Sequence, residues 1–513
     1  MPESTEIGVK LGLCLLAAAM VFLRHRVPGD LRRERREQAG LPLVFTAFLA
    51  VLAYYNFGTF HGGEPVHHHE QFHYYLSAEY FPELGYDGLY VASIAAQRER
   101  EPGTPFPPYV QDLRKNQVVP AAELEEHLRE VVGRFSPARW SRFVEDHQQF
   151  LAESRGQLSK LRLDHGFNGT PAWLFVARLF SRWLPPTHGG LRALAGLDDL
   201  LLAAMFLAIF LTYGARVACL SLIVFGLSYP SRFTWIGGGF LRQDWLAASV
   251  GAVCLLRRDR PAAAGALLGY AAMMRVFPAL FLCGVLVAAI RDLRAGAGLR
   301  RARRLAGGFA AVVLLLLAGG CLAGRGVEGW TAFFRDVTLH QRTWFTNNVG
   351  LANVLIHDAG TLDRSHVDPS LPDPWRPWEE AMESSRERRM PLLAASRAAL
   401  LLLTGAAALS APLDAAVILG LAAIFSLTLL ACYYWGMLVL VPLREPGWPA
   451  TVALLLLNSA FYGVHLRYPL HEARYGAVCL GLAVFFTAWI APAALRNLRL
   501  LRRSAPDPRA AGS

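Results

Sequence analysis

The chain of 513 residues is too apolar for an ordinary soluble enzyme, because 54% of its residues are hydrophobic and many apolar runs reach bilayer length. The formal net charge of +11 does not indicate a nucleic-acid partner, because the arginines gather at the ends of apolar runs and orient them. The seven cysteines lie in or beside apolar runs, which excludes a disulfide framework in the loops. This composition predicts a polytopic membrane protein.

The predicted elements begin with two apolar runs, at 8–23 and 41–58, which we expect to cross the membrane as the first unit of the chain, residues 1–58. A basic segment rather than a small-residue cleavage site follows the first run, so we expect that span to be retained. Three arginine clusters place their loops in the cytoplasm. They comprise Arg24, Arg26, Arg32, Arg33, Arg35 and Arg36; Arg291, Arg294, Arg300, Arg301, Arg303 and Arg304; and Arg496, Arg499, Arg502 and Arg503.

This orientation places residues 59–192 outside the membrane as a helical extracytoplasmic loop. Within it, LEEHLREVVGRF and RFVEDHQQFLAESRGQLSKL have the periodicity of helices with one apolar face. The segment PAWLFVARLFSRWL, at 171–184, carries Arg178 and Arg182 on an otherwise apolar helix. We expect that helix to lie in the membrane interface rather than to cross it.

A transmembrane bundle follows over 193–323, then a second extracytoplasmic loop over 324–391, and finally a C-terminal bundle with a basic cytoplasmic tail over 392–513. Arg275 and Pro278 interrupt one apolar stretch, which predicts a hairpin of short segments with Arg275 near its outer tip. The fold class is all-α, with about 11–13 transmembrane helices. The spans after 192 are expected at 193–213, 216–229, 239–256, 261–274, 277–290, 305–323, 392–409, 414–432, 434–444, 449–464 and 474–492.

His69, Glu70 and His73 spell H-E-x-x-H directly behind the second span. On a helix the two histidines share a face, as zinc needs, and the glutamate is placed as a general base. One hypothesis is therefore a membrane zinc metalloprotease with His69 and His73 as ligands. The motif stands in a histidine-rich run, and no third ligand is evident in the sequence.

The rival interpretation takes Glu70 as a lone carboxylate at the mouth of a cavity, followed by Tyr74 and by GYDGLY at 85–90. Further along come DHGFNGTPAW at 164–173, GGGFLRQDWL at 237–246, Arg275 three positions before Pro278, and TNNVGLANVL at 346–355. In this order the segments resemble the GT-C superfamily of membrane glycosyltransferases, particularly the polyprenyl-phosphate-mannose-dependent type, in a bacterial branch. The acid of that family is usually aspartate and its basic residue is commonly lysine, where this chain has Glu70 and Arg275.

The resemblance implies a hexosyltransferase that moves a sugar, with inversion, from a polyprenyl-phosphate-linked donor to an acceptor. The site would face the periplasm at the outer side of a bacterial inner membrane, with Glu70 as the catalytic base. An arginine at the outer end of a span would stabilise the leaving phosphate, because its fork binds two oxygens. No cofactor is certain and a divalent cation is left open; the expected partners are the lipid-linked donor, a glycan or lipid acceptor and membrane lipids, with no nucleic acid.

The remaining candidates are polar or aromatic residues expected near the outer ends of the spans. Asp244 is interpreted first as the salt partner of Arg242, and Asp198 and Asp199 as acids at a helix N-terminus. A third hypothesis, a lipid or polysaccharide transporter without chemistry, rests on the broken spans alone. The full substrate-binding set is His73, Tyr74, Tyr75, Arg242, Gln243, Asp244, Arg275, His340, Asn347, Asn348, Arg467 and Arg474.

Overall fold

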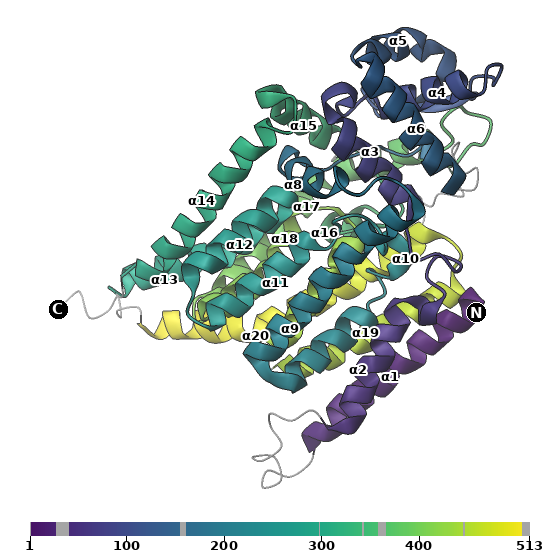
Figure 1. Ribbon diagram of the computed structural model, residues 1–513. Helices are drawn as coiled ribbons and strands as arrows, with labels where there is room; N and C mark the ends of the chain where they lie inside the picture. The colour runs from purple at the N-terminus through teal and green to yellow at the C-terminus, as the bar shows by residue number, and fades with distance from the viewer. Residues whose placement is uncertain are drawn as a thin grey trace.

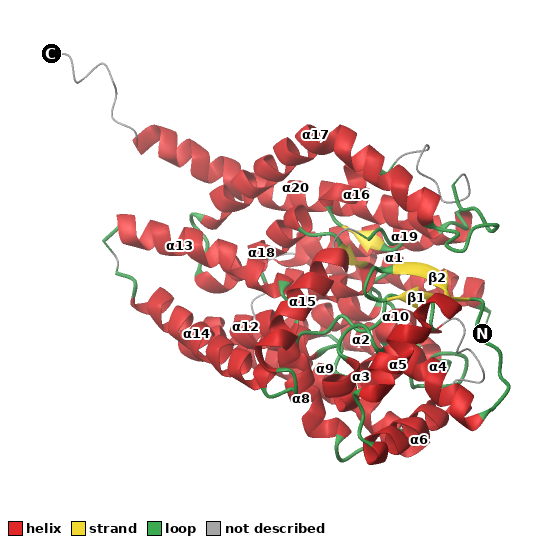
Figure 2. Ribbon diagram, turned by 90° about the horizontal axis from the view of Figure 1, so that it is seen from above, coloured by secondary structure: helices red, strands yellow, loops and turns green. Residues whose placement is uncertain are grey.

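The computed structural model describes residues 2–26, 40–153, 161–296, 298–340, 343–357, 366–444 and 447–504. Helices dominate, and the strands form two small two-stranded sheets (Figures 1 and 2). Most of the first arginine cluster and the last residues of the expected cytoplasmic tail lie outside the described residues.

The N-terminal pair consists of α1 (Glu3–Arg26) and α2 (Leu41–Tyr54), followed by the short η2 (Asn56–Gly58). The helix α1 packs mainly against α19 (Gly447–Arg467), and α2 packs against α9 (His188–Gly226). Their outer faces expose large apolar side chains, which suits contact with lipid: Leu15, Leu16, Phe22, Phe45 and Phe48.

The segment after α2 forms a compact unit at one end of the long helices (Figure 1). It contains α3 (His68–Leu84), α4 (Leu89–Arg100), η3 (Ala121–Leu124), α5 (Glu125–Gly133), α6 (Pro137–Glu153) and α8 (Pro171–Ser181). The sequence predicted only helices here, but β1 (Tyr109–Asp112) and β2 (Gln117–Pro120) form an antiparallel hairpin with Val110 opposite Val119. The alternating pattern of YVQD and QVVP is too short to stand out from the sequence.

The first part of the bundle runs from α9 to α14. Gly214, with φ 81° and ψ 172°, breaks α9 between the two spans expected on either side of it. After α10 (Phe233–Ile236), the helices α11 (Asp244–Arg257) and α12 (Pro261–Met274) pack side by side. The chain then leaves helical geometry at Arg275, as predicted, and continues in η4 (Phe277–Phe281), α13 (Leu282–Arg294) and α14 (Arg300–Cys321).

The second expected loop, 324–391, contains α15 (Gly326–His340), β3 (Asn348–Val349) and α16 (Leu351–Ile356). The helix α17 (Arg376–Ala408) continues through the expected boundary at 391, with Pro391 inside the helix. The C-terminal part adds α18 (Leu413–Leu427), β4 (Leu430–Ala431), η7 (Cys432–Leu443), α19 and α20 (His471–Ser504). The strand β3 pairs with β4, so Asn348 lies opposite Ala431.

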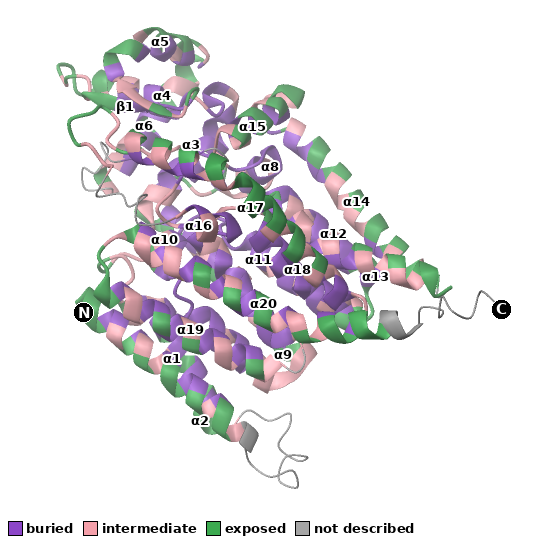
Figure 3. Cartoon of the chain, turned by 180° about the vertical axis from the view of Figure 1, so that it is seen from behind, coloured by how far each residue is buried: buried purple, intermediate pink, exposed green. Residues whose placement is uncertain are grey.

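Six helices in the described part of the chain are long and apolar enough to cross a membrane, which indicates a membrane location. They comprise Glu3–Arg24 of α1, α9, α14, α17, α19 and His471–Leu500 of α20. Exposed residues line the outer faces of α14 and α20, whereas α11 and α18 lie largely buried in the interior (Figure 3). The larger expected total, about 11–13 spans, stays a prediction, because the other apolar helices are shorter.

Candidate functional site

The start of α3 positions Glu70. His67 is the N-cap, and its Nδ1 accepts a hydrogen bond of 3.2 Å from the backbone N–H of Glu70. A side-chain acceptor at this position satisfies one of the free N–H groups of the first helical turn. Glu70 therefore stands in the first turn of α3, where the positive end of the helix dipole favours a carboxylate.

A glycine-rich loop before α11 packs against the segment that leads into α3. The N–H of His67 donates to the carbonyl of Gly238 at 2.9 Å, and His61 Nε2 donates to the carbonyl of Gly237 at 2.7 Å. Gly238 has φ +72°, and a Cβ there would lie 1.9 Å from the carbonyl oxygen of Pro65. Only glycine permits this approach, which brings the loop against the first turn of α3.

The residue before Arg242 carries backbone strain. Leu241 has φ 49°, a left-handed conformation that is uncommon for a leucine, and its carbonyl accepts a bond of 3.0 Å from Trp173 Nε1. The carboxylate of Asp198 accepts the next two N–H groups, those of Arg242 and Gln243, at 2.9–3.0 Å. Asp198 lies inside α9 rather than at its N-terminus, so its expected role is corrected: it anchors the backbone that presents Arg242.

Arg242 pairs with Glu70. Its Nε lies 2.9 Å from Glu70 Oε2, and its guanidinium lies 4.2 Å from the centre of the Tyr74 ring and 5.4 Å from that of Tyr433. The Arg242 side chain is 2% exposed, whereas that of Glu70 is 16% exposed. The expectation that Asp244 is the salt partner of Arg242 is therefore wrong.

Arg275 approaches the same tyrosine from the end of α12. Its guanidinium lies 5.7 Å from the Tyr74 ring centre, and its Nη1 donates to the carbonyl of Met274 at 2.9 Å. Asp244 binds elsewhere: its Oδ2 accepts from the Tyr270 hydroxyl at 3.0 Å, and its Oδ1 accepts from the Trp245 N–H. Within the described residues, Arg275 Nε, Arg275 Nη2 and Arg242 Nη1 are buried without a hydrogen-bond partner.

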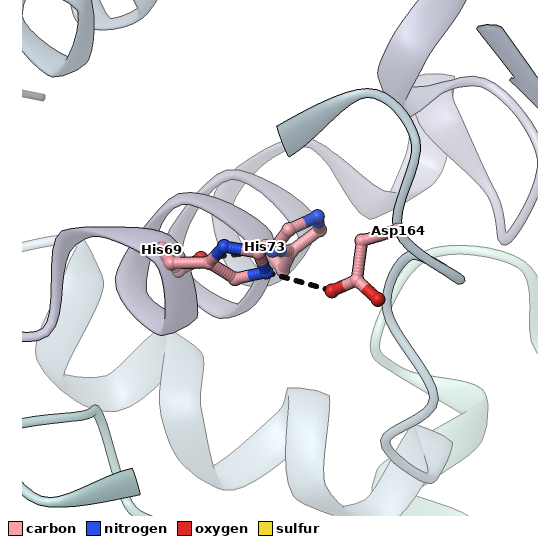
Figure 4. A group of neighbouring side chains, drawn as sticks. All are labelled: His69, His73 and Asp164. Carbon is pink, nitrogen blue, oxygen red and sulfur yellow. Dashed lines mark hydrogen bonds and ion pairs between the residues drawn. The ribbon is translucent and has the colours of Figure 1, made fainter. Parts of the chain in front are cut away.

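A second polar cluster joins α3 to the segment that precedes α8 (Figure 4). His69 Nε2 lies 2.7 Å from Asp164 Oδ2, in the segment that precedes α8. His73 Nδ1 donates to the carbonyl of His69 at 2.8 Å, and its Nε2 accepts from the Tyr90 hydroxyl at 2.8 Å. One ligand atom from each of His69, His73 and Asp164 lies within 4.8 Å of the other two, a grouping that could hold a metal ion.

The charges of this cluster follow from its surroundings. Burial opposes protonation of His69, but the hydrogen bond and charge of Asp164 outweigh it and raise the pKa of His69. Against the effect of burial, His69 and then His73 hold the pKa of Asp164 far below its usual range. Burial and the neighbouring His69 lower the pKa of His73 to about 4, so its ring is neutral at pH 7.

The structure brings only part of the candidate set together. Glu70, Tyr74, Arg242 and Arg275 share one cluster, with the backbone of Gln243 fixed beside it and His73 one turn along α3. Tyr75 instead packs against Phe150, at 5.6 Å between ring centres.

The other candidates contact residues outside this cluster. His340 Nδ1 donates to the carbonyl of Asp336, and Asn347 Nδ2 donates to Cys432 Sγ at 3.7 Å. The carbonyl of Asn348 accepts from Asn353. Arg467 is exposed, and Arg474 Nε donates to the carbonyl of Tyr468 at 2.6 Å.

Three residues of the site were missed as site residues: Tyr433, Asp198 and Asp164. Tyr433 was not singled out as a site residue in the sequence, and Asp164 stood in DHGFNGTPAW without an assigned role. In the sequence, Asp198 was visible only as an acid at the start of an apolar run. Its contact with the N–H of Arg242 joins α9 to the loop before α11. No sequence spacing encodes such a contact.

The site therefore combines a partly exposed carboxylate with two buried guanidinium groups on one aromatic ring. Such a grouping can bind an oxyanion through the unpartnered N–H groups and can accept a proton at the carboxylate. No protein-family model, curated protein or solved structure matches this chain.

Proposed function

We propose that this protein is a membrane glycosyltransferase that transfers a sugar from a polyprenyl-phosphate-linked donor to a hydroxyl acceptor. One observation carries the proposal: Glu70 pairs with the buried guanidinium of Arg242, and the buried guanidinium of Arg275 lies on the same Tyr74 ring as Arg242. Within the described part of the chain, both arginines retain N–H donors without a hydrogen-bond partner. A phosphate needs such donors, and a nucleophilic hydroxyl needs such a carboxylate.

The phosphate would bind between the two arginines. Within the described residues, Glu70 is the only carboxylate in ion-pair contact with Arg242, and none is in ion-pair contact with Arg275. In a buried site an additional anion gains more Coulomb energy than in water, because the effective dielectric constant is lower. A phosphate bridging Arg242 Nη1 and Arg275 Nη2 satisfies both charge and hydrogen bonding.

The reaction is a single displacement. The acceptor oxygen attacks the anomeric carbon and forms the new C–O bond while the bond from that carbon to the phosphate oxygen breaks. The electron pair leaves with the polyprenyl phosphate, whose growing negative charge Arg242 and Arg275 stabilise. The hydroxyl proton moves to Glu70, and attack opposite the leaving group inverts the anomeric carbon.

The ion pair between Arg242 and Glu70 has a consequence for the order of events. The guanidinium of Arg242 lies 2.9 Å from Oε2 of Glu70, so the pair occupies a carboxylate oxygen that could otherwise accept the proton of the acceptor hydroxyl. A donor phosphate competes for the same guanidinium, so its arrival weakens that pair and makes the Glu70 carboxylate available to the acceptor. Departure of the polyprenyl phosphate restores the pair.

The site would face the outside of a bacterial inner membrane. Asp244 starts α11 and Arg275 follows the end of α12, so both lie at the same end of this antiparallel pair, opposite the turn Arg257–Arg260. If the basic turn lies in the cytoplasm, the site lies at the outer surface. A lipid-linked donor could then place its phosphate at the site and its chain between lipid-facing helices.

The proposal is tested by turnover of purified protein in detergent or liposomes with a polyprenyl-phosphate hexose and a panel of hydroxyl acceptors. Glu70→Gln should lower the transfer rate by at least about 100-fold, because loss of a general base typically costs that much. Glu123→Gln is the matched control, since Glu123 is an exposed glutamate in the same compact unit that follows α2. Equal transfer rates in the Glu70→Gln variant and the wild type would remove Glu70 from the reaction.

The zinc hydrolase hypothesis gains a third ligand, Asp164, but loses its general base. In that chemistry the glutamate beside the first histidine activates water on the metal. Here the Glu70 carboxylate pairs with Arg242 instead. Metal-dependent peptide hydrolysis that remains intact in Arg242→Ala would favour the hydrolase. The transporter hypothesis instead predicts that the lipid-linked donor crosses the membrane equally well in Glu70→Gln and in the wild type.

A further inference from the structure

We propose that His69, His73 and Asp164 form a binding site for one divalent transition-metal ion of the zinc type. The two histidines lie one turn apart on α3, and Asp164 reaches them from the segment that precedes α8 (Figure 4). Two imidazoles and a carboxylate are a ligand set that Zn²⁺ favours. The sequence motif supplied the histidines, and only the fold supplies the aspartate.

The hydrogen bonds of His73 present the correct ring nitrogen. A carbonyl oxygen can only accept, so the bond from His73 Nδ1 to the His69 carbonyl fixes the proton on Nδ1. The lone pair of Nε2 then faces Asp164 and the Tyr90 hydroxyl, which in turn accepts the N–H of Gly166 at 3.1 Å. A metal-binding histidine usually has a hydrogen-bond partner on the ring nitrogen that does not bind the metal, and for His73 that partner is the His69 carbonyl on Nδ1.

The site needs little movement to accept an ion. The three ligand atoms already lie within 4.8 Å of one another, whereas tetrahedral zinc ligands lie about 3.3 Å apart at ordinary Zn–N and Zn–O distances. His69 Nε2 and Asp164 Oδ2, now 2.7 Å apart, would separate slightly as the bridging proton is released and the ion enters between them. His73 would exchange the Tyr90 hydroxyl for the metal.

A coordination position would remain open toward solvent. The side chains of His69 and Asp164 are 39% and 41% exposed, so water or a substrate oxygen can complete the shell. Glu70 faces Arg242 and does not serve this position. The ion would instead fasten the first turns of α3, which carry Glu70 and Tyr74, to the segment in which Asn168 accepts the Tyr74 hydroxyl at 2.8 Å.

The test measures metal binding by the full-length protein without any sugar donor, so it is independent of the proposed transferase activity. Chelator-treated protein is titrated with Zn²⁺ by calorimetry and with Co²⁺ by visible absorption. We expect one equivalent of each ion and a cobalt spectrum of tetrahedral type. His69→Ala, His73→Ala and Asp164→Asn should each weaken binding at least about tenfold.

Two further variants keep the result interpretable. His188→Ala removes a half-exposed histidine far along the chain and should leave binding unchanged. Tyr90→Phe removes the hydroxyl that competes for His73 Nε2 and should leave binding equal or tighter. Absence of a stoichiometric ion in folded wild-type protein, undiminished binding in the three ligand variants, or loss of binding in His188→Ala would each overturn the site.

Discussion

Arg242 holds the carboxylate of Glu70 at 2.9 Å while its guanidinium lies 4.2 Å from the centre of the Tyr74 ring. Glu70 and Tyr74 are one turn apart on α3, so an arginine from the loop before α11 contacts two residues on one helix face. Arg275 reaches the same ring from the end of α12. Four residues from three segments thus form one electrostatic unit, and a change in one should alter what the others bind.

Removing the charge of Glu70 should strengthen anion binding. In Glu70→Gln the guanidinium of Arg242 loses its anionic partner, so polyprenyl phosphate should bind several-fold more tightly than to the wild type. Calorimetry or ligand-induced thermal stabilisation of purified protein measures this. Glu123→Gln should show wild-type affinity, and weaker binding by Glu70→Gln would contradict competition between carboxylate and phosphate.

Arg275 should bind phosphate rather than support the empty fold. An arginine within an apolar stretch costs roughly 2.5–3.5 kcal/mol on insertion scales, and no carboxylate of the described residues lies in ion-pair contact with it. Arg275→Ala should therefore change the Tm of the empty protein little but weaken polyprenyl phosphate binding strongly.

Arg275→Lys is the companion variant. It should recover binding only in part, because an ammonium group lacks the forked pair of donors. Wild-type affinity in Arg275→Ala would remove this residue from the site. A large loss of Tm without ligand would assign it a structural role instead.

Gly238 should be intolerant of a side chain. Gly238→Ala adds a Cβ 1.9 Å from the Pro65 carbonyl oxygen in addition to the cost of about 1 kcal/mol for a positive φ. The loop must shift, which separates Arg242 from Glu70 and should lower both Tm and phosphate affinity. Gly62→Ala is the control, because Gly62 has φ +74° but open space where its Cβ would lie. If Gly62→Ala lowered Tm and phosphate affinity as much as Gly238→Ala, the clash with Pro65 would be excluded as the cause.

Stability should depend on pH through His147, a buried residue of α6. Burial and the charge of Arg162 lower the pKa of His147 to about 3, while its Nε2 lies 2.7 Å from Ser93 Oγ. Above the unfolded-state pKa of about 6.5, His147 is neutral in both states and contributes fully to stability. As pH falls toward the folded-state pKa of about 3, this contribution is lost because the unfolded state takes up a proton that the folded state does not. The free energy of unfolding should fall by up to about 1.4 kcal/mol per pH unit in this window.

Thermal unfolding of the full chain between pH 7 and pH 4 measures this dependence. His147→Asn cannot protonate, so its Tm should fall less steeply with decreasing pH, whatever its absolute stability. An identical pH profile in the variant would assign the acid sensitivity to other groups.

The compact unit from α3 to α8 should lie on the periplasmic side of the membrane, and the turn after α13 should lie on the cytoplasmic side. A topology reporter inserted at Gly103, in an exposed turn after α4, should report the periplasm. One at Gly296, directly after Arg291 and Arg294, should report the cytoplasm because basic loops are retained there. A cytoplasmic signal from Gly103 would place Glu70 on the wrong side for an outward-facing enzyme.

Several features followed from the sequence because they depend on neighbouring residues. The apolar runs of α1, α14 and α19 are evident from local hydropathy, since lipid compatibility is a property of each segment. The end of α12 at Arg275 was predicted from one arginine and one proline in an apolar stretch. Glu70 stood out for the same reason, as a carboxylate in a run that directly follows a span.

Only the tertiary structure decided which of these polar groups meet. Arg242 had an acid two positions away in Asp244, yet it pairs with Glu70, because Asp198 fixes its backbone and the glycine loop packs against the start of α3. Asp164 likewise meets His69 only through the path of the chain before α8. Side-chain partners in a buried site are selected by backbone placement across distant segments, whereas hydropathy and helical periodicity act over a few residues.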